Sequence, residues 1–570
     1  MPGMLLLHAD EGEACARWRK QGRAYWQDAF SLVLEKYGYL AVEQRTRRDV
    51  SQHQWESYDC VLVCQLPAGD WDDDLISWTK DGSRPVLLEA PFPPALLAQL
   101  GVEAHGVSAG ADGTLRLLDT ELRDRSAAFG YPGGGHVAAG SGRPVARLSE
   151  LDWRSIPAVG LTETHAQRWK CPGWDLERWS LTDGATAKPE ILADFTLHGD
   201  CAAPQPAVVR HGLMTAMALS LTAFLGQGHT SHPSDPGEHF SSGRRTGVET
   251  AVLALVDDLH ARAGASRARV LPWPRGATWA RSVRHDYDRQ ITVDHAEKVL
   301  SLHDREGSAA TWYWRSRHIE LERRPGGRGR QLVSPIELVA AHARSEVALH
   351  TELLWIEAAR ERALVEQAIG CEVAGSSAHG DPGCFRFQGA PNVLWAEREG
   401  LLYTEMIEHA HFHPHRFAAV DADGRVEASR VLCLPHHESL DRSSAPGDTN
   451  AHDVLEAAGR WQQMSGFLQV MNHPDIHTEE LFEVLRAMSS AGRLDLTSRE
   501  AADWWRASHD GTQLMLSAAA DERFEIRSMP GVNQMVLEIR QADGTIRTRV
   551  VDIEPGGSVA VSARAVTPSI

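Results

Sequence analysis

The residues best suited to chemistry lie in one short stretch, residues 282–289, with the sequence S-V-R-H-D-Y-D-R. Two of its carboxylates, Asp286 and Asp288, stand two positions apart. On a strand, side chains at i and i+2 point the same way, so both carboxylates would face one site. Such a pair can divide the work, with one carboxylate binding a metal and the other handling protons. The alternative is a pair of surface acids in salt bridges with Arg284 and Arg289.

Three later runs of strand-like composition also carry a histidine at their end. These are residues 346–350 with His350, residues 374–380 with His379, and residues 467–474 with His473. In a β/α barrel the carboxyl ends of the strands open onto one face, where catalytic groups gather. We therefore expect these histidines and the two carboxylates to converge on a single cleft.

The elements that must position these groups follow an α/β rhythm. An aromatic strand, T-W-Y-W, is expected at residues 311–314. Helical patterns are expected at residues 294–305, 335–343, 358–370 and 479–491, and the stretch 497–505 closes the domain. Strands that alternate with helices of this length predict parallel β/α units. We predict a distorted β/α barrel over residues 245–507.

The motifs of this region resemble those of the polysaccharide deacetylase family, the NodB-like carbohydrate esterases. Within that family the likeness is to the branch whose first motif is R-H-D-x-D. It rests on R-H-D-Y-D, E-V-A-L-H, H-G, N-H-P and T-x-x-E-x-A-x-W-W, in this order. The resemblance implies a metal-dependent hydrolase that removes an N- or O-acetyl group from a carbohydrate or amino-sugar substrate. Removal of an N-acetyl group would break a C–N amide bond that is not a peptide bond.

The resemblance also implies a role for each residue that matches a motif. Asp286 would be the general base and His473 the general acid. Asp288 and His350 would bind a divalent metal, for which we expect zinc, with cobalt or nickel as alternatives. A metal of this kind polarises an acetyl carbonyl and lowers the pKa of bound water.

The chain departs from the family pattern at two motifs. The second motif, H-[S/T]-x-x-H, has Leu354 in place of its second histidine. We assign the third metal ligand to His379, with Glu352 as the fallback. The motif R-x-P-[Y/F] is absent, and Arg386 could orient a carboxylate or lie on the surface. The candidates for substrate binding are Arg284, Glu352, Arg386 and Trp314.

These departures keep a second hypothesis open. The chain could be a non-catalytic carbohydrate-binding or scaffold protein built on a degenerate deacetylase fold. Metal content would separate the two hypotheses, since only the enzyme needs a tightly held ion.

Residues 1–230 alternate strand and helix patterns, which predicts a flavodoxin-like parallel sheet. The region resembles glutamine-amidotransferase-like domains, and more loosely ThuA-type domains, through Y-D-C-V-L-V and P-V-L-L-E-A-P. An amidotransferase needs a cysteine at a tight turn after a strand, whereas Cys64 lies inside the run 59–66. We therefore expect a non-catalytic domain, with amide transfer through Cys64 as an alternative. The apolar run 212–226 is too short to span a bilayer and predicts a buried helix.

Two further segments have distinctive patterns, one at the end of the chain and one inside the barrel region. Residues 511–570 show short strand patterns and a hairpin signal at 542–545, which predicts a small β-sandwich. The run H-A-H-F-H-P-H at residues 409–415 could bind metal, but we favour a partly exposed edge or loop.

Composition limits the classes of function. With 570 residues the chain is expected to form two to four domains. Its net charge of −19 argues against a nucleic-acid partner, because phosphate binding needs a clustered positive surface. Eight cysteines without a C-x-x-C pair imply neither a disulfide framework nor a structural zinc site. We expect a cytoplasmic protein with no membrane span and a carbohydrate partner, and self-association remains open.

Overall fold

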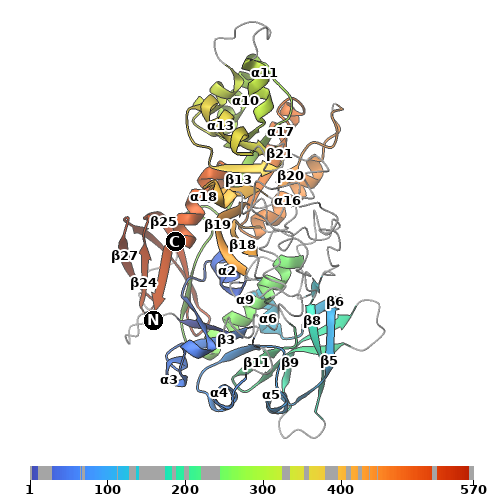
Figure 1. Ribbon diagram of the computed structural model, residues 1–570, viewed down its shortest axis with the longest axis vertical. Helices are drawn as coiled ribbons and strands as arrows, with labels where there is room; N and C mark the ends of the chain where they lie inside the picture. The colour runs from blue at the N-terminus through green and yellow to red at the C-terminus, as the bar shows by residue number, and fades with distance from the viewer. Residues whose placement is uncertain are drawn as a thin grey trace.

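A computed structural model describes the chain at residues 3–9, 29–64, 66, 71–111, 113–127, 136–139, 174–182, 188–197, 204–219, 222, 244–323, 334–351, 358–378, 396–405, 412–420, 426–434, 437–445, 447–516 and 523–563. Figure 1 shows three groups of elements: an N-terminal sheet at the lower end, a second sheet with helices at the upper end, and a β unit at one side. The architecture is mixed α/β, as the sequence predicts.

The N-terminal sheet has nine strands in the order β2-β1-β3-β4-β11-β10-β9-β6-β7. The strands from β2 to β11 run parallel, and those from β11 to β7 run antiparallel. Its strands are β1 Met4–His8, β2 Val42–Thr46, β3 Cys60–Cys64, β4 Val86–Glu89, β6 Gly113–Leu117, β7 His136–Ala139, β9 Glu190–Leu197, β10 Gln205–His211 and β11 Met214–Met217. The flavodoxin-like assignment remains a prediction for this half-parallel sheet.

Six helices and a two-stranded ribbon are described next to this sheet. They are α2 Ala29–Lys36, α3 Gln52–Trp55, α4 Asp73–Asp81, α5 Pro94–Leu100, α6 Thr120–Ala127 and α9 Arg244–Arg262, with β5 Val102–Ala111 paired to β8 Trp174–Leu181. Residues 251–259 of α9 share the buried core of β1, β3 and β4. The division into domains at 230 and 245 remains a prediction, and this packing groups α9 with the first domain.

The prediction of a buried helix at 212–226 is wrong for residues 212–219. Residues 214–217 form strand β11, which turns back from β10 at Gly212 (φ 58°) and pairs with β4. All four residues of β11 are buried. A short apolar run buried on both faces has no periodicity that separates a strand from a helix, which explains the error.

The second sheet has ten strands and curls into a half-barrel. The order is β18-β19-β17-β16-β15-β14-β13-β21-β20, with β22 also paired to β13. Neighbouring strands are parallel except for β18 with β19. The strands are β13 Trp279–Tyr287, β14 Ala310–Trp314, β15 Ser345–Thr351, β16 Gly375–Ala378, β17 Tyr403–Glu405, β18 His415–Val420, β19 Val426–Leu434, β20 His437–Ser439, β21 Phe467–Asn472 and β22 Arg493–Asp495.

The predicted helices of this region are confirmed to within a few residues at each end. They are α10 Val293–Glu306, α12 Pro335–Ala341, α13 Ala358–Ile369 and α17 Thr478–Ala487. The region also forms α11 Ser316–Arg323, α16 Ala451–Gln463 and α18 Ser498–Trp505, which were not predicted. Capping residues explain the two ends of α10. The Thr292 side chain accepts a hydrogen bond from the backbone N–H of His295, and Gly307 ends the helix with φ 62°. Among the described helices, none is both long and apolar enough to cross a membrane.

Strand β13 pairs with three neighbours in the half-barrel, β14, β21 and β22. All nine of its residues are buried, although they include two arginines, a histidine and an aspartate. Strand β14, the aromatic run T-W-Y-W, lies beside it with every residue buried. Charged side chains in such a place must be paired, because an isolated buried charge is costly.

The C-terminal strands form two three-stranded sheets over one small core. One sheet contains β23 Thr512–Leu516, β24 Arg523–Ser528 and β27 Gly557–Ser562, and the other β12 Arg267–Val270, β25 Val532–Arg540 and β26 Ile546–Ile553. The sequence did not predict that β12, which follows α9, would pair with β25. The π-helical turn Arg506–Asp510 connects α18 to this unit.

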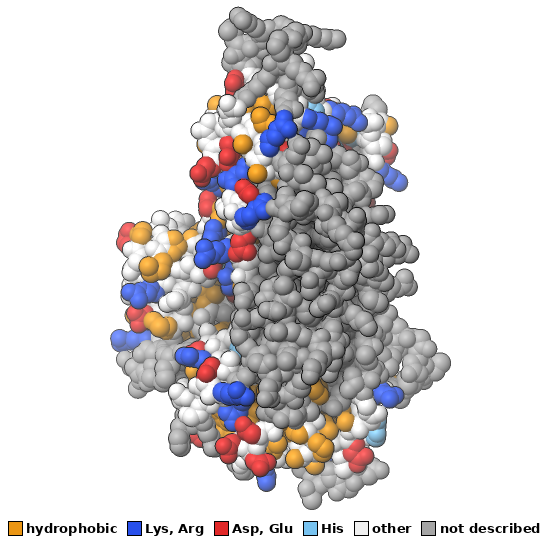
Figure 2. All heavy atoms as spheres, viewed as in Figure 1, with side chains coloured by type: hydrophobic (Ala, Val, Ile, Leu, Met, Phe, Trp, Pro, Cys, Tyr) orange, Lys and Arg blue, Asp and Glu red, His pale blue; other side chains and the backbone are white. Residues whose placement is uncertain are grey.

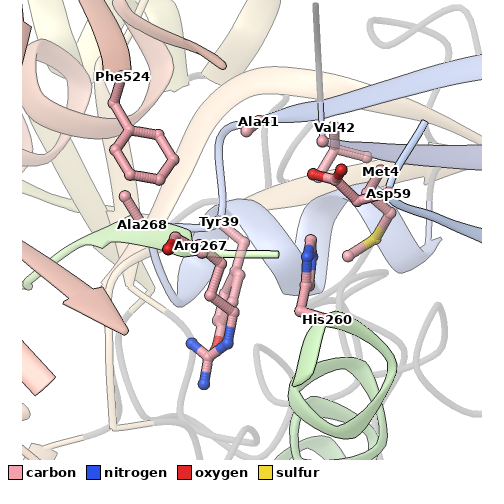
Figure 3. A pocket seen from close by; sticks show the side chains of 11 residues that line it. Met4, Tyr39, Ala41, Val42, Asp59, His260, Arg267, Ala268 and Phe524 are labelled. Carbon is pink, nitrogen blue, oxygen red and sulfur yellow. The ribbon is translucent and has the colours of Figure 1, made fainter. Parts of the chain in front are cut away.

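A cavity of about 20 Å³ lies where the first and last parts of the chain meet. Figure 3 shows Asp59 and His260 on one side of it, with Arg267, Tyr39 and Phe524 on the other. This volume suits a single water molecule and excludes a metabolite. On the face shown in Figure 2, basic and acidic side chains are interspersed over the described surface, without a continuous basic stripe there.

Gly375 allows a close approach between neighbouring strands. A Cβ built on this residue of β16 would lie 2.1–2.3 Å from ring atoms of Tyr403 on β17. We predict that Gly375→Ala lowers the free energy of unfolding by about 1–3 kcal/mol, because the fully buried ring must shift.

The matched control is Gly459→Ala in α16, where an added Cβ meets nothing within 4 Å. It should raise stability by about 0.5–1 kcal/mol, the helix preference of alanine over glycine. Urea unfolding of the two variants measures both changes. Equal stabilities would contradict the close packing of β16 against Tyr403.

Candidate active site

Four of the predicted site residues lie together at the carboxyl ends of three parallel strands. Asp286 is the last residue but one of β13, and Asp288 follows the end of that strand. His350 lies near the end of β15, and His473 directly follows β21. Because β21, β13, β14 and β15 are adjacent and parallel, their ends meet at one edge of the sheet.

Asp288 is the centre of this group. Its Oδ1 lies 3.3 Å from His350 Nε2, and its Oδ2 lies 3.2 Å from His473 Nε2. The guanidinium of Arg315 lies 3.5 Å from Oδ1, and the backbone carbonyl of Asp288 accepts a hydrogen bond from His318 Nε2 at 3.0 Å. The carboxylate is 20% exposed, so the group is open to solvent on one side.

Asp286 is held in its ionised form. Burial raises the pKa of this carboxyl, but Arg284, His350 and His473 together bring the pKa below its usual value. Arg284 contributes most of this effect, since Nε and Nη2 donate to the two carboxylate oxygens at 2.7 and 2.9 Å. Asp286 Oδ2 also lies 3.7 Å from His350 Nε2. The result is a buried carboxylate that stays negative at neutral pH.

Arg284 has a second carboxylate partner, Glu405 on β17, to which Nη1 donates. Burial raises the pKa of Glu405, and the guanidinium opposes this shift. Around Glu405, Tyr313 donates its hydroxyl and Gln469 donates its amide at 2.6 Å. Sequence analysis missed Glu405 because β17 is only three residues long.

His473 is held in its protonated form. Burial alone lowers the pKa of this imidazole, but bonds to Asp288 and Asp441 raise the pKa to about 10. Asp441 Oδ2 accepts from the backbone N–H of His473 at 2.5 Å and from Nδ1 at 2.8 Å. Asp441 was not predicted. The sequence signal that could have identified Asp441 is its position in L-D-R-S, two residues after the short strand β20.

Two predicted substrate-binding residues need correction. Trp314 is fully buried, and its ring stacks on Tyr287 at a centroid distance of 3.6 Å, so it packs the core. Arg284 is also buried, and its guanidinium is bonded to protein carboxylates. Both side chains are enclosed by the protein, so neither is exposed for contact with a substrate.

The prediction of a partly exposed histidine run also needs correction. His413 and His415 are 3% and 1% exposed. The ring of His413 packs edge-on against Tyr37, from the region around α2, with centroids 5.3 Å apart. This contact with a distant part of the chain could not be read from local sequence. Residues His409, His411, His379, Glu352, Leu354 and Arg386 lie outside the described residues.

Cys64 is not suited to amide transfer. It is buried, and burial together with the nearby Glu89 raises the pKa of its thiol well above the ordinary value. The thiolate needed for nucleophilic attack is therefore disfavoured.

The donor types at the site fit part of a metal centre. Among the residues that the structure describes, no group of three or more histidine, cysteine or acidic side chains is placed to hold a metal ion. Asp288 and His350 nevertheless bring a carboxylate oxygen and an imidazole nitrogen to 3.3 Å, and zinc binds both donor types. Two of the three predicted ligands are thus adjacent.

No protein-family model matches the chain, and no curated protein matches it. Solved structures of carbohydrate deacetylases are among its structural neighbours. Agd3, a carbohydrate deacetylase, aligns with a TM-score of 0.41 and 10% identity over 99% of this chain and 98% of that one. A candidate polysaccharide deacetylase from Mycobacterium smegmatis aligns with a TM-score of 0.31 and 18% identity over 41% and 92%. A pseudoenzyme of family CE4 from Bacillus anthracis aligns with a TM-score of 0.26 and 10% identity over 40% and 67%.

Arg284, in the first motif, and Arg289, directly after it, differ in environment, and this difference can be tested. Arg284 is buried between two carboxylates, whereas Arg289 is 64% exposed and pairs only loosely with Asp475 at 3.3 Å. We predict that Arg284→Leu lowers the free energy of unfolding by about 3–5 kcal/mol, because it leaves buried carboxylates unpaired.

Arg289→Leu is the matched control and should change stability by less than about 0.5 kcal/mol. Chemical denaturation of both variants measures the difference. A small effect at both positions would favour the alternative of two surface salt bridges.

Proposed function

We propose that the chain is a metal-dependent hydrolase that removes an acetyl group from a carbohydrate or amino-sugar substrate. The observation that carries this proposal is the close approach of two carboxylates and two histidines at one edge of the half-barrel. His350 Nε2 lies 3.7 Å from Asp286 and 3.3 Å from Asp288, and His473 Nε2 lies 3.2 Å from Asp288. In this group the pKa of Asp286 is lowered and the pKa of His473 is raised. Titratable groups whose environments drive their pKa values apart are the pattern of an acid–base pair.

Asp286 is suited to the role of general base. It keeps its charge at neutral pH because Arg284 offsets the cost of burial, and it can accept a proton from a water molecule at the strand edge. Arg284 fixes both carboxylate oxygens by two hydrogen bonds, so the base has one orientation.

His473 is suited to the role of general acid. Nδ1 donates to Asp441, which leaves Nε2 as the nitrogen on the side of Asp288. The protonated Nε2 could pass its proton to the leaving amine or alcohol. Its side chain is 27% exposed, so a substrate can reach it.

Asp288 and His350 would bind the metal, with His379 as the third ligand and Glu352 as the fallback. Zinc is the metal we propose, with cobalt or nickel as alternatives. When bound, it would polarise the acetyl carbonyl and lower the pKa of a bound water molecule. His350 is fully buried, and its Nε2 lies 3.3 Å from Asp288 Oδ1. Its ring therefore points toward the position where both side chains would bind the metal.

A second candidate function is a non-catalytic carbohydrate-binding or scaffold protein. It is favoured by Leu354, which stands where the family has a second histidine ligand. In either case we propose three domains, at 1–230, 245–507 and 511–570, with the first serving in substrate binding or assembly.

The enzymatic proposal predicts a large loss of activity in the double variant Asp288→Ala/His350→Ala. Acetate release from N-acetylated sugar oligomers should fall by about a thousandfold, because proton transfer and metal assistance both depend on this edge. The control is Asp304→Asn, an exposed carboxylate on α10 that contacts His342 at 3.0 Å. Full activity in the double variant would rule out the mechanism.

Metal content separates the two candidate functions. We predict about one zinc, cobalt or nickel ion per chain in the purified wild-type protein, and loss of that ion in Asp288→Ala/His350→Ala. Elemental analysis by mass spectrometry measures this directly, with Asp304→Asn as the variant that keeps the ion. A metal-free wild-type protein from metal-supplemented cells would contradict the enzymatic proposal and favour the scaffold.

A further inference from the structure

A row of buried hydrogen-bonded side chains lies behind the candidate site, on the face of β13 opposite to Arg284 and Asp286. His285 Nδ1 lies 3.2 Å from Asn472 Oδ1, and His285 Nε2 lies 2.8 Å from His303 Nε2. His303 Nδ1 in turn lies 2.7 Å from the hydroxyl of Ser308. These four residues, His285, His303, Ser308 and Asn472, are each 0% exposed, so they have no contact with solvent.

The contacts of Asn472 with Ile476 and Asp441 show which of its amide atoms is the nitrogen and which is the oxygen. Nδ2 lies 2.7 Å from the backbone carbonyl of Ile476 and 3.4 Å from Asp441 Oδ1. Both of these atoms only accept hydrogen bonds, so the amide nitrogen must face them and the amide oxygen must face His285. His285 therefore donates from Nδ1.

The direction of every other bond in the row follows from this one. Burial lowers the pKa of His285 to about 4 and that of His303 well below its usual value, so both rings are neutral. A neutral His285 with a proton on Nδ1 accepts at Nε2, so His303 donates from Nε2. His303 then accepts at Nδ1, and Ser308 donates its hydroxyl proton.

The row ends at Asp441, which accepts two hydrogen bonds from His473. One oxygen of Asp441 faces the Asn472 amide, and the other accepts from the backbone and Nδ1 of His473. Asn472 also fixes the turn after β21 through its bond to Ile476. His285 and Asn472 are partners in the register of β13 and β21, so the row couples the first motif to the N-H-P motif.

We infer that His285 is a positioning residue that acts on His473 through Asn472. It fixes the amide of Asn472, which holds the carboxylate of Asp441 in place. The alternation of the strand explains the R-H-D order: Arg284 and Asp286 point into the half-barrel, and the histidine between them faces the helices. The effect on catalysis rests on the proposed function, whereas the effect on the orientation of His473 does not.

The test compares two substitutions of His285. Leucine has no donor, whereas the side-chain amide of asparagine places a donor close to the former Nδ1. We expect kcat of His285→Leu to fall about tenfold with KM and metal content unchanged, as for other supports of a site histidine. His285→Asn should restore most of kcat. A kcat of the folded leucine variant within twofold of wild type would overturn the inference.

Nuclear magnetic resonance of ¹⁵N-histidine-labelled protein gives a readout that does not depend on activity. The Nδ1–H proton of His473, identified by its loss in His473→Gln, should shift in His285→Leu and return in His285→Asn. An unchanged resonance in the leucine variant would overturn the inference even if the wild type proved inactive. If that variant does not fold, the wild-type spectrum decides, since His285 must be neutral with its proton on Nδ1.

Discussion

The half-barrel depends on one buried arginine between two carboxylates. Arg284 bonds Asp286 through two nitrogens and Glu405 through the third, and all three side chains are almost fully excluded from water. Removing three charges from water costs several kcal/mol per ion, which is offset only when the geometry and the remaining hydrogen bonds are satisfied. The surrounding donors, Tyr313 and Gln469, meet that need. The positions of β13, β14, β17 and β21 are therefore linked through one network.

The two faces of β13 carry different kinds of side chain at adjacent positions. The face with Arg284 and Asp286 carries charge and keeps the base ionised. The face with His285 carries a neutral row that reaches the turn after β21. Because side chains alternate along a strand, a single tripeptide can connect the charged interior and the helical layer. A shift of β13 by one residue would exchange the two faces and disrupt both networks.

The sequence predicted the parts of the fold whose information is local. Long helices with caps, and buried strands with a chemically distinctive end, were found, including those that carry Asp286, His350 and His473. Short strands such as β17 and β20 carry too few residues for a pattern, so Glu405 and Asp441 were missed. Partners far apart in the chain, such as β12 with β25 or His413 with Tyr37, depend on tertiary packing, which no local pattern encodes.

The absent R-x-P-[Y/F] motif is weak support for a decayed enzyme, because its expected task is done elsewhere. From the sequence, Arg386 could orient a carboxylate or lie on the surface, and in the structure Arg284 of the first motif donates to both oxygens of Asp286. Apolar residues of similar volume often match or exceed the stability of a buried ion network. An acid–base catalyst would require an ionised carboxylate and a protonated histidine at one edge, whereas a scaffold would not require the histidine to be protonated. These buried charges therefore support the catalytic proposal, in addition to linking β13 with its neighbouring strands.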